Sequence, residues 1–282
     1  MKLLSETKRL CHLYGIRPTR SKGQNFLISE GIYSKIIEEG ELTGSDQVLE
    51  VGPGFGFMLL RLADQVKKVL AVELDDRISR ALQSELEKRK ISNVCLLNQD
   101  ILDLELPPSN LKGSYKVMAN LPYNISSIFL RKFLSSPGRP KLLVLLLQKE
   151  VAERIVAEPP QMSLLAVSVQ YYTYPCFVKK VTPGNFWPSP RVDSAIVKLR
   201  VKPKLPLPQG REESFFKLVK AGFSSKRKML KNNLVSRSEF SAGEVEEIFS
   251  DLGLNPKIRA QELSLDDWLK IYNTKISYAK LK

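Results

Sequence analysis

A strand followed at once by a glycine-rich turn constrains this chain more than any other stretch. Val48 to Val51 predicts a buried strand, and glycines follow it at alternate positions, Gly52, Gly54 and Gly56. The apolar run at 57–62 then predicts a helix. Glycine adopts positive φ angles and lets a ligand approach the backbone closely. The stretch therefore predicts the nucleotide-binding turn of an open α/β sheet.

A second strand pattern ends in an acidic residue at the distance that ribose binding requires. Residues 68–73 end in Glu73, about 20 positions beyond Gly52, where a carboxylate accepts hydrogen bonds from both ribose hydroxyls. A dinucleotide fingerprint would have its third glycine where this chain has Phe57. The turn also lacks the Lys-Ser or Lys-Thr pair of a phosphate-binding loop. The pattern therefore favours S-adenosylmethionine over a nicotinamide cofactor.

Another acidic residue follows the third strand pattern, which covers 93–98. Asp100 would lie beside the glycine turn in such a sheet and can accept a hydrogen bond from an adenine amino group. Taken alone, Asp100 would as readily cap the next turn. Together with Gly52 and Glu73, it indicates a contact with the cofactor.

The most specific motif, Asn120-Leu121-Pro122-Tyr123, follows the fourth strand pattern at 115–119. The Asn120 amide oxygen and the Leu121 carbonyl could each accept one N–H of an exocyclic aromatic amine and favour its tetrahedral transition state. Pro122 turns the Leu121 carbonyl out of the strand ladder, and Tyr123 offers a ring for stacking of the base. The alternative is an ordinary strand end with a proline turn and a core tyrosine.

An aromatic pair further along the chain suggests a second contact with the same base. Phe186 and Trp187 precede Pro188 and Pro190, and the prolines hold the pair rigid before the strand pattern at 192–199. Such a pair suits a clamp on the other face of an extruded base, with Phe186 holding the ring. Ordinary packing of aromatic residues beside prolines is the alternative.

A basic cluster lies near the start of a helix predicted over 227–236. Lys226, Arg227 and Lys228 come first, and Lys-Asn-Asn follows at 231–233. Cations and amides on one helix predict a contact with the phosphate backbone of a nucleic acid. A solvated helix face is the alternative.

Strand and helix patterns alternate up to a proline-rich linker, which predicts parallel strands joined by crossover helices. The last two strand patterns, 174–181 and 192–199, predict an antiparallel pair at one sheet edge. The expected fold is therefore an α/β, Rossmann-like sheet of seven mixed strands. We expect one domain at 1–203, with the cofactor site and a basic N-terminal segment, and a small all-helical RNA-binding domain at 210–282. The expected strands are 47–51, 68–73, 93–98, 115–119, 141–147, 174–181 and 192–199.

Composition narrows the class of protein and suggests its partner. The 282 residues carry 44 Lys and Arg against 30 Asp and Glu, a formal net charge of +14, which predicts binding to nucleic acid. A generic basic surface is the alternative. Three scattered cysteines predict free thiols in a reducing cytoplasm, and the single histidine predicts no metal site. No apolar run approaches the roughly 20 residues of a membrane span, so we expect no membrane association.

Seven motifs occur in the same order in one known family, the bacterial ribosomal RNA small subunit adenine N6,N6-dimethyltransferases. The chain resembles this family over nearly its whole length. Two departures are Leu59, where the family often has threonine, and Ile128-Phe129, where it often has proline; neither removes a predicted contact. The motifs are Gly23 to Leu27, Glu50 to Gly56, Glu73, Gln99-Asp100, Asn120 to Tyr123, Phe186 to Ser194, and Arg227 to Leu230 with Asn232 to Leu234.

The resemblance implies a class I methyltransferase sheet with a small helical domain. It implies an enzyme that uses S-adenosylmethionine to dimethylate the N6 amines of two adjacent adenines in the 3′-terminal hairpin of 16S ribosomal RNA. The expected partner is the immature small ribosomal subunit, and the expected enzyme is a cytoplasmic monomer with a role in ribosome biogenesis. The positions that it implies contact the cofactor, with Gly54 added from the glycine turn, are Asn25, Leu27, Gly52, Gly54, Glu73, Asp100 and Asn120.

Two other functions stay open at this point. A large-subunit ribosomal RNA adenine methylase of the antibiotic-resistance type shares the cofactor and amine motifs. The stretch from Phe186 to Ser194 and the Asn-Asn-Leu run at 232–234 favour the small-subunit enzyme instead. A protein that assists ribosome assembly mainly by binding is the second alternative, although intact cofactor and amine motifs argue against a purely structural role.

Overall fold

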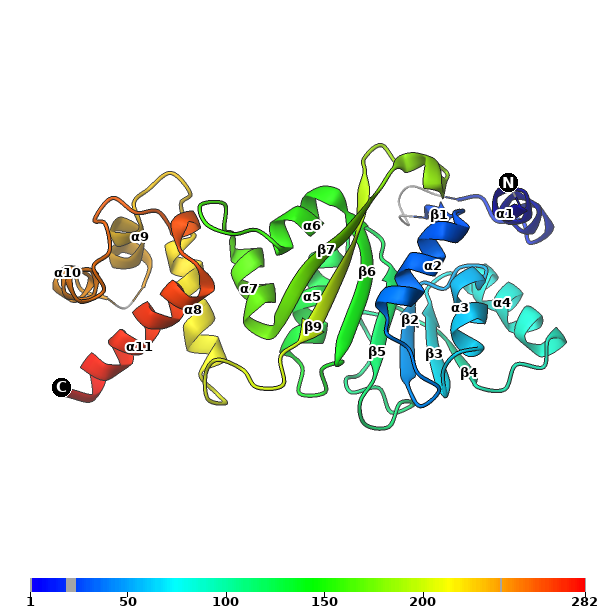
Figure 1. The fold of residues 1–282 in the computed structure, drawn as a ribbon, viewed down its shortest axis with the longest axis horizontal. Coiled ribbons are helices and arrows are strands. Elements are labelled where there is room, and N and C mark those ends of the chain that lie inside the picture. The colour runs from blue at the N-terminus through cyan, green and yellow to red at the C-terminus, as the bar shows by residue number, and fades with distance from the viewer. Residues whose placement is uncertain (1, 19–23, 239, 282) are drawn as a thin grey trace. The chain divides into compact units, whose positions relative to one another are not determined.

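One sheet of seven strands organises the first part of the computed structural model, which describes residues 2–18, 24–238 and 240–281 (Figure 1). The strands are β2 (Gln47–Val51), β3 (Lys68–Glu73), β4 (Val94–Asn98), β5 (Lys116–Asn120), β6 (Leu142–Gln148), β7 (Thr173–Val181) and β9 (Ser194–Val201). Their order is β4-β3-β2-β5-β6-β9-β7, and β9 runs antiparallel to both neighbours while the strands from β4 to β6 pair in parallel. The α/β fold class and the antiparallel pair at one edge are thereby confirmed.

Three helices cover one face of this sheet. They pack on alternate strand residues such as Val48, Val69 and Met118, which belong with them to one buried apolar cluster. The intervening strand residues are buried too, because crossover helices lie on both faces of a parallel sheet. The three helices are α2 (Glu30–Glu39), α3 (Phe57–Ala63) and α4 (Asp76–Lys88).

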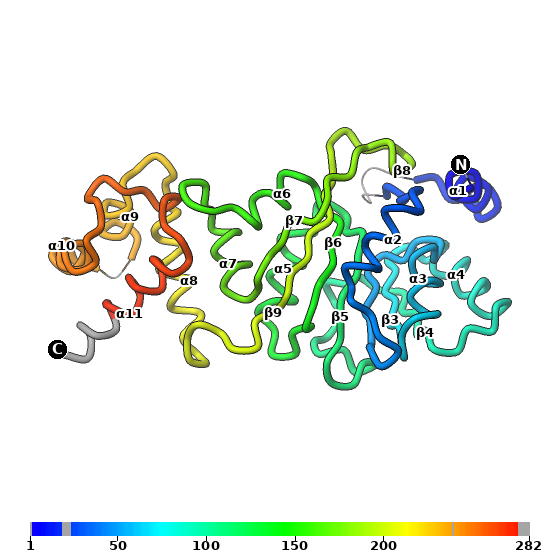
Figure 2. The backbone as a smooth tube through the Cα atoms, in the orientation of Figure 1, coloured from blue at the N-terminus to red at the C-terminus, as the bar shows by residue number. Residues whose placement is uncertain are grey.

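A two-stranded ribbon that the sequence patterns did not predict lies beside the sheet. Strand β1 (Phe26–Leu27) pairs antiparallel with β8 (Phe186–Trp187), which places Leu27 opposite Phe186. The hydroxyl of Tyr33 in α2 donates to the Leu27 carbonyl at 2.9 Å and holds the ribbon on the helix. Figure 2 shows the connection from β7 to β9 passing through β8 near β1. The ribbon therefore joins the two predicted motifs at 23–27 and 186–194.

The N-terminal helix α1 (Lys2–Leu13) packs on the glycine turn. Cys11 and Ile16 form a small buried cluster with Phe55 of the turn and Ile78 of α4. The predicted basic N-terminal segment continues beyond this helix, but residues 19–23 lie outside the described part of the chain.

The chain divides into two compact units, Met1–Ala152 with Thr173–Lys202, and Glu153–Tyr172 with Pro203–Lys282. The second unit thus includes residues 153–172, which the sequence analysis placed in the first domain. Its buried centre contains Tyr171, Phe215 and Trp268. No helix in the described ranges is long and apolar enough to cross a membrane. The remaining α-helices are α5 (Ser126–Ser135) in the first unit and α6 (Lys149–Ile155), within which the division between the units falls. The second unit then contains α7 (Leu164–Tyr172), α8 (Glu212–Gly222), α9 (Leu230–Arg237), α10 (Ala242–Asp251) and α11 (Leu265–Leu281).

Candidate active site

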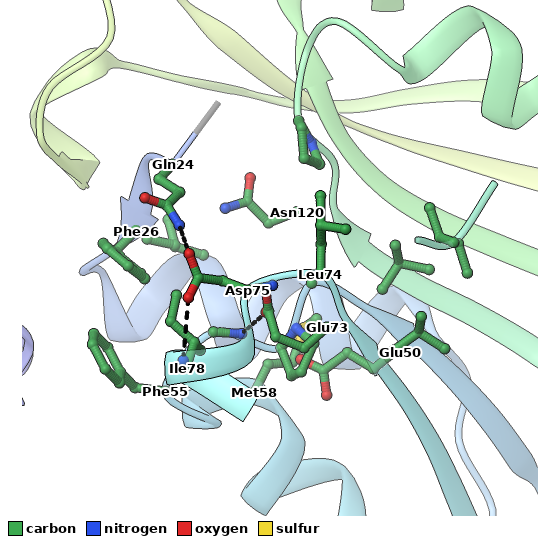
Figure 3. A pocket seen from close by; sticks show the side chains of 18 of the residues that line it. Gln24, Phe26, Glu50, Phe55, Met58, Glu73, Leu74, Asp75, Ile78 and Asn120 are labelled. Atoms are coloured by element: carbon green, nitrogen blue, oxygen red, sulfur yellow. Dashed lines mark hydrogen bonds between the residues drawn. The ribbon is translucent and has the colours of Figure 1, made fainter. Parts of the chain in front are cut away.

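A cavity of about 300 Å³ opens at the carboxyl ends of β2, β3 and β5 (Figure 3). This edge of a parallel sheet is where open α/β folds bind ligands. The structure brings all seven residues of the predicted cofactor set to the wall of this one cavity, although their contacts with a cofactor remain a prediction. The seven residues are Asn25, Leu27, Gly52, Gly54, Glu73, Asp100 and Asn120.

The glycine turn needs its glycines for conformation and for space. Gly52, Gly54 and Gly56 have φ angles of 65°, 57° and 83°, in the left-handed region that other residues avoid. A Cβ on Gly56 would lie 2.5 Å from a methyl carbon of Leu82 in α4. At Gly52 the nearest atom would be the Asn120 carbonyl oxygen at 3.9 Å, so the turn stays open toward the cavity there.

Glu73 ends β3 with its carboxylate held by the backbone of two turns. One carboxylate oxygen accepts from the Gly54 amide at 3.1 Å and the other from the Asp75 amide at 2.9 Å. The side chain is 7 % exposed, and burial raises the pKa of Glu73 in spite of these hydrogen bonds. Each oxygen keeps a second lone pair, so the fixed carboxylate can still accept from a ribose diol.

A second carboxyl group, which the sequence analysis left without a role, lies in the same wall. Glu50 of β2 is 1 % exposed, and its Oε2 has no hydrogen-bond partner in the described chain. Burial first, and then the charge of Glu73, raise the pKa of Glu50 well above its usual value. The signal in the sequence was a charged residue inside an otherwise apolar strand. Figure 3 shows Glu50, Glu73 and Asn120 around the cavity.

Asn120, the last residue of β5, has its amide group oriented by the residue that precedes β1. Its Nδ2 donates to the Asn25 carbonyl at 3.1 Å, so its Oδ1 is the atom left to accept. The next residue, Leu121, donates its amide to the Leu146 carbonyl at 3.2 Å. In the described chain no hydrogen bond uses the Leu121 carbonyl, in agreement with the turn that Pro122 imposes. Two acceptors therefore stay available where the motif predicted them.

Tyr123 is half-buried outside the cavity wall, and its hydroxyl lies 2.7 Å from the Ser194 hydroxyl at the start of β9. Burial raises the pKa of Tyr123 above its usual value, so the phenol stays neutral. This hydrogen bond connects the motif at 120–123 with the motif at 186–194. Its effect is to fix the direction of the tyrosine ring.

Phe186 does not offer the open ring face that the sequence predicted. It is 3 % exposed, because its pairing with Leu27 in the ribbon turns the ring into the cluster that α2 and the sheet share. In this arrangement Phe186 is a packing residue of the apolar cluster behind the site. The structure therefore shows no open ring face at Phe186, and a contact of Phe186 with the target base stays a prediction.

The basic cluster Lys226-Arg227-Lys228 is exposed, but it does not lie on a helix. Helix α9 begins only at Leu230, after an extended Met229 with ψ of 146°. The Asn233 side chain is 1 % exposed and donates to the carbonyls of Gly222 and Ser225 at 2.7 and 3.0 Å, which closes the turn after α8. The cations therefore lie on a turn, and Asn233 is a structural residue without access to phosphate.

The described wall of the cavity contains carboxyl groups but no histidine and no cluster of metal ligands. His12 is exposed on α1 and is absent from the cavity wall. Across the residues with described positions, no three His, Cys, Asp or Glu side chains come together in a way that could hold a metal ion. The arrangement can bind a ligand along the strand ends and place an amine against two acceptors.

The model of the ribosomal RNA adenine dimethylase family matches residues 17–277. A ribosomal RNA small subunit methyltransferase A of Dehalococcoides mccartyi is 39 % identical over 94 % of this chain and 91 % of its own length. One of the same name from Clostridium botulinum is 36 % identical over 94 % and 96 %. A dimethyladenosine transferase of Plasmodium falciparum superposes with a TM-score of 0.78 at 27 % identity, covering 90 % of this chain and 98 % of that one. The 23S ribosomal RNA methyltransferase ErmE gives 0.74 at 26 % identity over 89 % and 99 %.

Proposed function

Because the chain belongs to the ribosomal RNA adenine dimethylase family, we propose that it transfers methyl groups from S-adenosylmethionine to the N6 amines of two adjacent adenines. The proposed substrate is the 3′-terminal hairpin of 16S ribosomal RNA in the immature small subunit. Relatives named for the small subunit are 36–39 % identical, whereas the 23S methyltransferase is 26 % identical. One observation supports the chemistry most: Asn120 and Leu121 present two unused acceptors beside the glycine-turn cavity.

The residues of the cavity fit S-adenosylmethionine. Glu73 is fixed by Gly54 and Asp75 where it can accept from both ribose hydroxyls. Asp100 stands at the same wall for the adenine amino group, and the open backbone at Gly52 admits the methionine portion. The cofactor supplies a methyl group on a positively charged sulfur. Fully buried Glu50 adds a carboxyl group whose free oxygen could accept from a cationic ligand.

Catalysis in this proposal depends on position. The Asn120 Oδ1 and the Leu121 carbonyl each accept one N–H of the target amine, which localises the nitrogen lone pair for attack. The proton becomes acidic only as the new C–N bond forms, and water can then take it. No side chain in the described cavity wall is therefore needed as a general base. Tyr123, with its hydroxyl held by Ser194, offers a ring edge or face to the base.

The charge of the chain supports an RNA partner, and we propose that Lys226, Arg227 and Lys228 contact phosphates from their exposed turn. The three cysteines, free in the structure, agree with a reducing cytoplasm. A single chain contains every residue that this mechanism uses, so we propose that a monomer acts on the subunit.

Labelled S-adenosylmethionine offered in parallel to unmethylated small subunits, large subunits and naked 16S RNA tests the proposal. We expect label in the small subunit, on the N6 positions of two neighbouring adenines near the 3′ end. Asn120→Ala should slow transfer about 10²–10³-fold, as the loss of one preorganised polar contact does elsewhere. Label confined to large subunits would favour the alternative methylase. Binding to small subunits without any transfer would favour an assembly factor that acts by binding.

A further inference from the structure

Gln148 is a polar residue in a prominent place that the proposed mechanism does not use. It ends β6, and the six residues before it in that strand are all buried whereas Gln148 is partly exposed. Its side-chain amide makes no hydrogen bond within the described part of the chain. A partly buried amide of this kind needs a partner, which is either water or a ligand.

The register of the sheet places Gln148 on the same face as Asn120. Asn120 pairs with Leu146 in the parallel ladder between β5 and β6. Side chains alternate along a strand, so Gln148, two positions beyond Leu146, points to the face that Leu146 and Asn120 share. Gln148 therefore lies on the strand next to Asn120 and one step farther toward the ligand side of the sheet.

Gln148 also neighbours the tyrosine of the amine motif. In the antiparallel ladder it pairs with Ser194, whose hydroxyl lies 2.7 Å from that of Tyr123. Directly paired residues have Cβ atoms about 4.5–5.5 Å apart, so the amide of Gln148 is within reach of a base held by Tyr123.

The backbone around Gln148 is fixed on both sides. The Leu146 carbonyl accepts from the Leu121 amide at 3.2 Å, and the Lys149 amide donates to the Asp193 carbonyl at 2.9 Å. A side chain on such a rigid strand end is preorganised for recognition. The fixed strand thus presents a donor and an acceptor beside the place of the target amine.

We propose that Gln148 recognises the target adenine, with its side-chain NH₂ donating to a ring nitrogen beside the amine, N1 or N7. Both hydrogens of the amine are already directed at Asn120 and Leu121, which leaves these two ring acceptors for a donor. A donor at N1 would select adenine, because guanine carries a hydrogen on N1, whereas N7 accepts in both bases. The assignment rests on the proposed function.

Single-turnover methylation of small subunits that carry adenine, 1-deazaadenine or 7-deazaadenine at one target position tests this assignment. Each analogue replaces one ring nitrogen by C–H. Wild-type enzyme should lose about tenfold in the single-turnover rate constant on one of the two analogues, the cost of one neutral hydrogen bond in a preorganised site. Gln148→Ala should lose about tenfold on adenine and show no further loss on that analogue.

Three controls separate the possible outcomes. Gln65→Ala, on an exposed turn, should behave as wild type. Gln148→Glu keeps the size of the side chain but removes the donor, so it should be slow on adenine with unchanged cofactor affinity. A Gln148→Ala enzyme with the wild-type rate, or one that still loses about tenfold on the analogue to which wild type is sensitive, overturns the assignment. Wild-type enzyme that fails to methylate unmodified adenine overturns the proposed function instead.

Discussion

At the scale of single residues, the cavity depends on two carboxyl groups with different surroundings. Glu73 has both oxygens in hydrogen bonds to backbone amides, whereas Glu50 has a buried oxygen that meets no hydrogen-bond partner among the described residues. The first arrangement fixes a carboxylate for a neutral diol. The surroundings of Glu50 instead favour the protonated carboxyl group, because burial disfavours the charged form.

Glu73→Ala should weaken S-adenosylmethionine binding at least tenfold. The variant removes a charged acceptor from two ribose hydroxyls, and charge-assisted hydrogen bonds contribute about 1.5–3 kcal/mol each. Titration calorimetry measures the affinity, with Glu87→Ala on the exposed end of α4 as the matched control. Equal affinities for wild type and Glu73→Ala would remove Glu73 from the site.

Glu50→Gln should stabilise the ligand-free protein, and increasingly so as pH rises above about 5. The raised pKa of Glu50 means that the folded state keeps a proton that the unfolded chain loses above its own pKa of about 4.3. Glu50 therefore lowers the free energy of unfolding by up to about 1.4 kcal/mol per pH unit until its folded pKa is reached.

Denaturant unfolding of both proteins at several pH values measures this difference. Glu41 and Asp46 have lowered pKa values and act in the opposite direction, but they are the same in both proteins and cancel. A difference in unfolding free energy that does not change with pH would show that Glu50 ionises alike in the folded and unfolded states.

The single-turnover rate of methyl transfer should vary little between about pH 6 and 9. Water accepts the proton late in the reaction, whereas a histidine base would impose a titration step near its pKa of about 6.5. His12→Ala should leave the whole profile unchanged, since His12 is exposed on α1. An inflection near pH 6.5 that disappears in His12→Ala would require a general base.

At the scale of elements, the sequence patterns located the strands of the central sheet and the turn that opens the cavity. Long apolar strands and glycines at alternate positions are strong local signals. The β1–β8 ribbon was missed because two residues are too few to show a period. The burial of Phe186 follows from that ribbon, so no pattern within 186–194 could have revealed it.

The basic turn shows a similar limit. The run from 226 onward has the composition of a helix start, but the Asn233 side chain closes the preceding turn through two hydrogen bonds, one buried and one partly buried. That contact spans 11 residues. Glu50 was visible as a charged residue in an apolar strand, yet its missing hydrogen-bond partner is a property of packing alone.

Tyr123 and Ser194 should act as one unit through their hydrogen bond, which joins the turn after β5 to the start of β9. Tyr123→Phe and Ser194→Ala should each slow methylation about 2–10-fold, since one neutral hydrogen bond contributes about 0.5–1.5 kcal/mol. The double variant should be no slower than either single one. Cofactor affinity should not change. Additive losses in this double-mutant cycle would show that the two hydroxyls act independently.

At the scale of the whole molecule, the net charge of +14 is typical of a protein that binds a polyanion such as nucleic acid. Some acidic side chains are engaged in ion pairs: Asp46 binds Lys116 and Lys141, and Glu41 binds Lys198 and Arg200. An ion pair lowers the positive charge that a cation presents to a polyanion, even where the cation is half-exposed, as at Lys141 and Arg200. Cations outside such pairs are therefore the best placed to contact RNA, and the exposed turn at 226–228 offers three in succession.

Replacing Lys226, Arg227 and Lys228 together by Ala should make RNA affinity less sensitive to salt. Each phosphate contact contributes about 0.7–0.9 to the slope of log affinity against log salt concentration, so the slope should become less negative by about 2–3. Cofactor affinity should stay the same. The matched control replaces Lys67, Lys88 and Lys90, three exposed cations at the edge of the sheet opposite the cavity, and should keep the wild-type slope. Equal slopes for all three proteins across a salt titration would show that the turn at 226–228 faces solvent in the complex. The RNA contact would then have to be sought among cations of the first unit.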